Sequence, residues 1–190
     1  MGKGSEGERR KAELKRMADK PITALDNEFV RFGKTVADVM AHRGKAEDMA
    51  LDANIGFILL DKEERRGLAS FTPAERHVYA VQGMSREVNN GGFEQFFFNS
   101  SGELAFDLVP ALEAMGSKDN LLIAKRAVAR FGTPASLAEE TRHAHLEKLI
   151  EEAGEEGVWH DLDDEFYDNP EDLEKMILDY IARNPTAFGG

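Results

Sequence analysis

The stretch "EVNNGGFEQFFFNSSGE", residues 87–103, decides how the middle of the chain folds. Two adjacent glycines, Gly91 and Gly92, interrupt a helical pattern, because glycine destabilises helices and permits a positive φ. Three phenylalanines that follow have the i, i+3, i+4 spacing of one buried helix face: Phe93, Phe96 and Phe97. We therefore predict a sharp corner in the chain with an aromatic plug behind it.

The polar side chains of this stretch allow a structural and a catalytic interpretation. In the first, amides satisfy the backbone groups that the corner exposes. In the second, Glu87 would have to act without a His or Lys nearby in sequence, and no phosphate-binding glycine pattern accompanies it. We favour the structural interpretation and expect no enzyme; burial of Glu87 and Asn89 would exclude catalysis here. The motif comprises Glu87, Asn89, Asn90, Gly91, Gly92, Phe93, Gln95, Phe96, Phe97 and Asn99.

Capping signals predict where helices begin and end. Thr72, followed by proline and then Glu75, is typical of a capping box. Further starts are predicted by Thr-Pro, Asn-Pro and Ser-x-x-Glu patterns at Thr133, Asn169 and Ser100. Ends are predicted at two glycines that accept the left-handed conformation: Gly116 and Gly132.

Apolar residues recur with helical periodicity between these signals, for example from Leu173 to Ile181. Helices are also expected over 22–42 and, after a break near Gly44, over 49–64. No segment alternates as a half-buried strand does. We predict an all-α, compact multi-helix domain at 67–190, preceded by a helical N-terminal region at 21–66 and a basic polar tail or frayed helix at 1–20.

Composition narrows the function. The 190 residues contain no cysteine, which excludes disulfides and thiolate chemistry, and the net charge is −12. Residues 139–190 alone carry sixteen Asp and Glu against four Lys and Arg. Such a surface repels nucleic acid, so we expect no direct nucleic-acid partner. No apolar run is long enough for a membrane span and no signal peptide is visible, so we expect a cytoplasmic protein.

The acidic residues of the last quarter form a candidate partner-binding surface. Carboxylates one helical turn apart lie ~5.4 Å apart along the axis, of the same order as phosphates along a DNA strand. They could therefore occupy a cleft lined with Lys and Arg, or they could serve solubility alone. The set is Glu147, Glu151, Glu152, Glu155, Glu156, Asp161, Asp163, Asp164, Glu165, Asp168, Glu171 and Asp172.

Metal binding is not expected. The acidic stretch from Asp161 has Phe166 where a calcium loop needs glycine, and Asp172 closes it instead of glutamate. The histidines lack metal-ligand spacing. We predict no metal and no cofactor. The aromatic residues beside this stretch, Trp159 and Tyr167, either pack it onto the core or anchor a partner.

The motif at 87–103, preceded by "TPAERHVYAVQGMSR" and followed by "LVPALEAMGS", resembles the signature of a bacterial family named after the C-terminal domain of an acidic DNA mimic protein. The end of the chain, "LDDEFYDNPEDLEKMILDYIARNPTAF", is similar to the family's C-terminal end. The resemblance covers residues 68–188 and implies an all-α fold. The family's namesake is a homodimer whose acidic surface imitates double-stranded DNA and occupies a transcription factor's DNA-binding site.

Two functional hypotheses follow. In the first, the protein is a DNA mimic that binds a basic, nucleic-acid-binding protein, such as a transcription factor, through its C-terminal carboxylates. In the second, it is a helical interaction or dimerisation module, and the acid serves solubility only. A homodimer is compatible with both.

Overall fold

The computed structural model describes residues 31–134, 136–154 and 157–189. The predicted tail at 1–20 and residues 21–30 lie outside this part. The described residues form helices and no strand, apart from one isolated bridge between Arg43 and Ala46, so the all-α prediction is confirmed. From residue 31 onward they belong to one compact unit.

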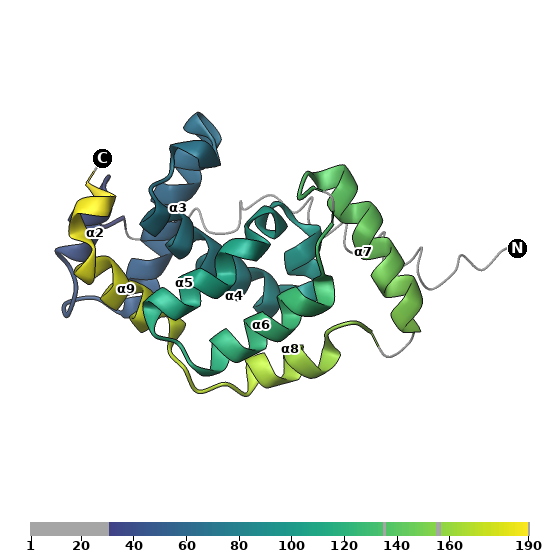
Figure 1. The fold of residues 1–190 in the computed structure, drawn as a ribbon. Coiled ribbons are helices and arrows are strands. Elements are labelled where there is room, and N and C mark those ends of the chain that lie inside the picture. Colours follow the sequence, from purple (N-terminus) through teal and green to yellow (C-terminus); the bar gives the residue numbers. More distant parts are fainter. Residues whose placement is uncertain (1–30, 135, 155–156, 190) are drawn as a thin grey trace, which may run out of the picture. The chain divides into compact units, whose positions relative to one another are not determined.

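Eight α-helices and three 3₁₀ helices make up this described part (Figure 1). The α-helices are α2 (Val36–Met40), α3 (Asp48–Arg66), α4 (Pro73–Phe98), α5 (Leu108–Met115), α6 (Asp119–Phe131), α7 (Glu139–Ala153), α8 (His160–Tyr167) and α9 (Leu173–Arg183). The 3₁₀ helices are η2 (Leu68–Ser70), η3 (Ser100–Asp107) and η5 (Pro185–Phe188).

Helix α4 is the element around which the others pack. It contacts η3, α5, α7 and α8, while α9 packs on α3, α5 and α4. Helix α8 runs beside α6 (Figure 1). The start of α4 is the predicted capping box: Thr72 Oγ1 accepts the Glu75 N–H at 3.2 Å, and the Glu75 carboxylate accepts the Thr72 N–H at 2.7 Å. The Lys62 ammonium also donates to the Glu75 carboxylate at 2.7 Å. This buried carboxylate therefore has both a backbone N–H and a positive charge as partners.

The corner predicted at the two glycines is present as a kink within α4. Gly91 has φ −170° and ψ 27°, and Gly92 has φ 77° and ψ −179°. The second conformation is essentially restricted to glycine. Behind it lies the aromatic plug, whose three phenylalanines are fully buried. Phe97 stacks on Phe131 of α6, with centroids 4.3 Å apart, and contacts the buried Trp159.

Several predicted helix ends are correct. Helix α5 ends at Met115 and α6 at Phe131, each followed by a glycine with positive φ, Gly116 and Gly132. The helix predicted over 49–64 corresponds to α3.

Two predicted starts are wrong by several residues, and the reason is the same in both. Helix α7 begins at Glu139 rather than after Thr133, and α9 is capped by Asp172 rather than by Asn169. In each case a polar side chain nearby accepts the backbone N–H two residues further on: Ser136 from Ala138 and Asn169 from Glu171. Such local turns compete with helix initiation.

Two further segments differ from prediction. Ser100 begins a 3₁₀ helix that has no side-chain cap, and its N-cap residue is Asn99 rather than Ser100. Within 31–42 the helix is limited to α2, since a capping box between Thr35 and Asp38 starts a new helix at Val36.

We expect the Gly92→Ala substitution to destabilise the protein by at least ~2 kcal/mol, because it adds a steric clash to an unfavourable backbone conformation. A Cβ at this position would lie 2.4 Å from Asp163 Oδ2. The control is Gly116→Ala, where φ is also positive but no atom lies within 4 Å of the added Cβ. It should cost about 1 kcal/mol. Urea unfolding measures both; equal losses would contradict the close approach of α8.

Candidate partner-binding surface

The predicted acidic residues are distributed over α7, α8 and the start of α9. Glu155 and Glu156 lie outside the described residues. Helix α7 carries three of the others, all exposed: Glu147, Glu151 and Glu152. Four belong to α8, namely Asp161, Asp163, Asp164 and Glu165, and Asp168 follows its last residue. Glu171 and Asp172 precede α9.

Basic side chains of helix α7 bind the ends of the neighbouring helices. Arg142 is buried, with 1% of its surface exposed, and its guanidinium donates to the backbone carbonyls of Phe97 at 2.9 Å and Asn99 at 3.0 Å. Burial lowers the pKa of Arg142, and the negative charges of Glu103 and Glu139 act in the opposite direction. The carbonyls that accept from the guanidinium lie at the C-terminal, negative end of α4, which favours a cation. Gly102 leaves room for this contact, since a Cβ there would lie 2.8 Å from Arg142 Nε.

Two histidines of α7 make the same kind of bond. His143 donates from Nε2 to the Phe98 carbonyl at 2.7 Å and stacks on the Phe98 ring. His145 donates to the Phe131 carbonyl at the end of α6. Helix α7 therefore turns Arg142 and both histidines towards the ends of two other helices. Among its described residues, Lys148 is the only exposed Lys or Arg on the side that carries the glutamates.

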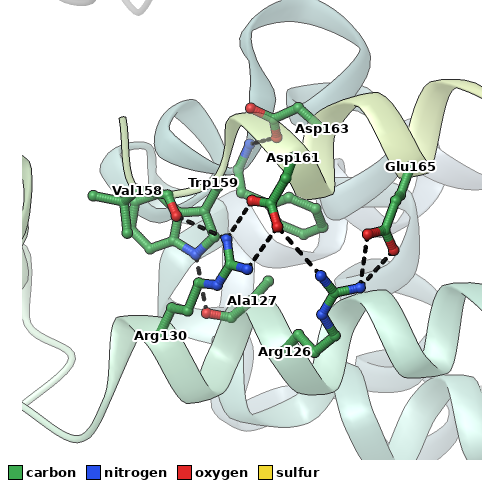
Figure 2. Close-up of polar contacts among 9 residues, drawn as sticks. Arg126, Ala127, Arg130, Val158, Trp159, Asp161, Asp163 and Glu165 are labelled. Atoms are coloured by element: carbon green, nitrogen blue, oxygen red, sulfur yellow. Dashed lines mark hydrogen bonds and ion pairs between the residues drawn. The ribbon is translucent and has the colours of Figure 1, made fainter. Parts of the chain in front are cut away.

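One side of α8 is neutralised by two arginines of α6 (Figure 2). Arg130 bonds Asp161 at 2.7 Å, and Arg126 bonds Asp161 at 3.2 Å and Glu165 at 2.6 Å. The hydrogen bond from Arg130 lowers the pKa of Asp161 to about 2. Beside these pairs, the Trp159 indole donates to the Ala127 carbonyl at 3.1 Å. Trp159 thus packs this segment onto the core.

Another side of α8 completes the kinked backbone of α4. Asp163 Oδ1 accepts the Phe93 N–H at 2.8 Å, as an N-cap residue would, although it comes from a different helix. The Tyr167 hydroxyl donates to the Val88 carbonyl at 2.7 Å, before the kink. Asp163 is half-buried, and burial raises its pKa.

The motif's amides therefore do not cap the corner as predicted. Asn89 donates to the Ser85 carbonyl one helical turn earlier. Gln95 and Asn99 both donate to Glu87 Oε2 at 2.7 Å, which links the two halves of α4 through side chains. The contacts from α8 that do complete the corner, made by Asp163 and Tyr167, were not predicted, because neither residue carries a sequence signal that points to the corner.

The same geometry bears on a catalytic role at the corner. Glu87 is buried, with 8% exposed, and its carboxylate is bonded by Arg86, Gln95 and Asn99. Asn89, in contrast, is exposed. The Glu87 carboxylate, which would act as acid or base, thus has both oxygens occupied by hydrogen bonds. Of the two residues whose burial would exclude catalysis, only Glu87 is buried.

Glu171 and Asp172 cap helices. Glu171 accepts hydrogen bonds from Ser117, Lys118 and Asn120 at the start of α6. Partial burial would raise its pKa, but these hydrogen bonds outweigh burial and lower the pKa to about 2. Asp172 accepts the Lys175 N–H at 2.8 Å.

Four of the predicted carboxylates remain exposed and make no side-chain hydrogen bond or ion pair with other described residues: Glu151, Glu152, Asp164 and Asp168. No group of three or more His, Asp or Glu side chains within the described ranges is arranged to hold a metal ion. None of the helices described is long and apolar enough to cross a membrane.

The fold and this surface define an acidic all-α protein whose signature motif spans the kink of α4 and the start of η3. The model of the family described as DMP19-like protein matches residues 69–184, more than half of the chain, and the chain belongs to this family. No curated protein and no solved structure gave a match.

We expect Asp163→Ala to destabilise the protein by about 1 kcal/mol, the typical loss for a helix cap. Hydrogen exchange at the Phe93 amide should accelerate at the same time, because that N–H loses its acceptor. Asp164→Ala is the matched control, since the neighbouring carboxylate is exposed and should change stability by less than roughly 0.5 kcal/mol. Similar losses in the two variants would show that the bond to Phe93 contributes nothing.

Asp161 should make stability depend on acid pH. Its folded-state pKa lies below the unfolded value, so its contribution is present above pH ~4 and is lost as pH falls towards about 2. Asp161→Asn should therefore be less stable than the native chain at pH 7, by up to roughly 1 kcal/mol for an exposed pair. The difference should close near pH 2. Thermal unfolding across this range measures it, and a constant difference would be the contrary result.

Proposed function

We propose that this protein is a non-enzymatic DNA mimic of the bacterial cytoplasm, which binds a basic, nucleic-acid-binding protein through outward-facing carboxylates of α7 and α8. Membership of the DMP19-like family supports the proposal, because the resemblance of its signature motif implies an acidic mimic. The bonded and buried Glu87 supports a non-enzymatic role.

The observation that carries the proposal is the way in which charge is separated on α7. Arg142, His143 and His145 are used to hold the helix in place through backbone carbonyls. Glu151 projects from the opposite side, and Glu152 is exposed at the end of the helix; neither has a partner among the described residues. Lys148 is the only Lys or Arg of α7 that lies one turn from these glutamates. A helix that needed acid only for solubility would gain from further Lys at this spacing, since like charges one turn apart are destabilising.

Fewer carboxylates are available to a partner than the predicted acidic surface contains. Backbone N–H groups donate hydrogen bonds to Asp163, Glu171 and Asp172. Arginines of α6 form ion pairs with Asp161 and Glu165. A basic partner would meet the remaining exposed carboxylates first. Such binding is dominated by charge, so it should weaken steeply with salt.

The decisive test is capture of partners on immobilised protein from a lysate of its own host, eluted by salt or by duplex DNA. We expect a DNA-binding protein that DNA displaces. The variant Glu151→Gln, Glu152→Gln, Asp164→Asn should lose at least about tenfold in affinity for it. The control removes three exposed carboxylates elsewhere: Glu47→Gln, Glu64→Gln, Glu113→Gln.

Equal loss in both variants would mean that net charge, rather than this surface, is responsible. Capture that ignores salt and DNA would instead support the alternative, an interaction or dimerisation module whose acidic face serves solubility. A homodimer remains a prediction under either outcome.

A further inference from the structure

Next to the side of α8 that pairs with the arginines, the end of the helix carries an exposed aromatic ring, with a carboxylate three positions before it and another directly after it. Tyr167 is 51% exposed, which is unusual for a residue whose hydroxyl is bonded within the fold. Tyr167 and Asp168 lie three and four positions after Asp164, so both are neighbours of Asp164 on the helix surface. Both aspartates are exposed and have no side-chain hydrogen bond or ion pair in the described part of the chain.

This ring is held in position before any partner arrives. Its hydroxyl donates to the Val88 carbonyl at 2.7 Å, and the ring makes a T-shaped contact with Phe166, with centroids 6.2 Å apart. Helix α8 itself is anchored by Asp163 and by the Asp161–Arg130 pair. Binding at this face would therefore cost little side-chain entropy, which is the main benefit of preorganisation.

The electrostatics of the face favour a cation. Partial burial raises the pKa of the Tyr167 hydroxyl, and the negative charges of Asp163 and Asp164 raise it further. Ring faces themselves attract cations. On the adjoining side of the same helix, carboxylates of this chain already pair with two guanidinium groups, from Arg126 and Arg130.

Among biological cations, a guanidinium matches this arrangement best. It is planar and weakly hydrated, so it stacks on an aromatic ring while its N–H groups fork towards carboxylates. A lysine ammonium is compact and strongly hydrated, and gains less from the ring. We propose that the face formed by Asp164, Tyr167 and Asp168 binds an arginine side chain of the basic partner. This assignment rests on the proposed function, and names the partner residue that α8 selects.

The experiment compares hexa-arginine and hexa-lysine peptides, which have equal charge, by calorimetry and amide NMR on the full chain. We expect hexa-arginine to bind roughly two- to fivefold more tightly, as a cation–π contact at an exposed site allows. Amide shifts should centre on residues 164–168. Asp164→Asn with Asp168→Asn should weaken both peptides; these exposed positions carry no bond that folding needs.

Two substitutions at Tyr167 separate the ring from the hydroxyl. Tyr167→Phe keeps the ring and loses only the bond to Val88, so it should retain the preference for arginine. Tyr167→Leu should bind the two peptides equally. Retained α8 chemical shifts would show that the variants are folded, and the double aspartate variant provides a second test if they are not.

The outcomes distinguish this inference from the function on which it rests. If native protein binds both peptides equally, or if Tyr167→Leu keeps the preference, the arginine assignment is wrong while binding of a basic partner stands. If neither peptide binds at low salt, both proposals fail. A preference that both Tyr167 substitutions abolish would locate the effect in the hydroxyl bond, and would also overturn the assignment.

Discussion

The break in the backbone of α4 at Gly91 and Gly92 is the constraint on which the rest of the structure depends. A kinked helix leaves backbone groups that must find partners elsewhere. Here α8 supplies them, through Asp163 to the Phe93 N–H and Tyr167 to the Val88 carbonyl. The position of α8 is thereby fixed, and with it the side on which its other carboxylates lie.

The acidic residues of α8 have different partners, because each face of the helix packs against a different part of the protein. Asp161 and Glu165 lie towards the arginines of α6, and Asp163 lies towards the kink (Figure 2). What remains outward is a small part of the acid that the composition suggests. The net charge of −12 therefore overstates the charge that is available to a partner.

Local signals made much of the fold predictable from sequence. The start of α4 at Thr72 and the helix ends before Gly116 and Gly132 depend on residues within one turn, and they were predicted correctly. The starts of α7 and α9 were not, because side-chain turns at Ser136 and Asn169 compete with the expected caps. Which carboxylates are exposed could not be predicted, since, apart from the local cap at Asp172, the bonds that occupy them join residues 31 to 70 positions apart.

The attachment of α7 has a consequence for how this protein can change over evolutionary time. The side chains of Arg142, His143 and His145 bind backbone carbonyls, which every residue type possesses. These bonds therefore place little restriction on which residues stand at the ends of α4 and α6. The residues that hold the helix are also distinct from those on its outer side. Substitutions can therefore accumulate on the outer side without loosening the helix, and related chains can acquire new partners while keeping one architecture.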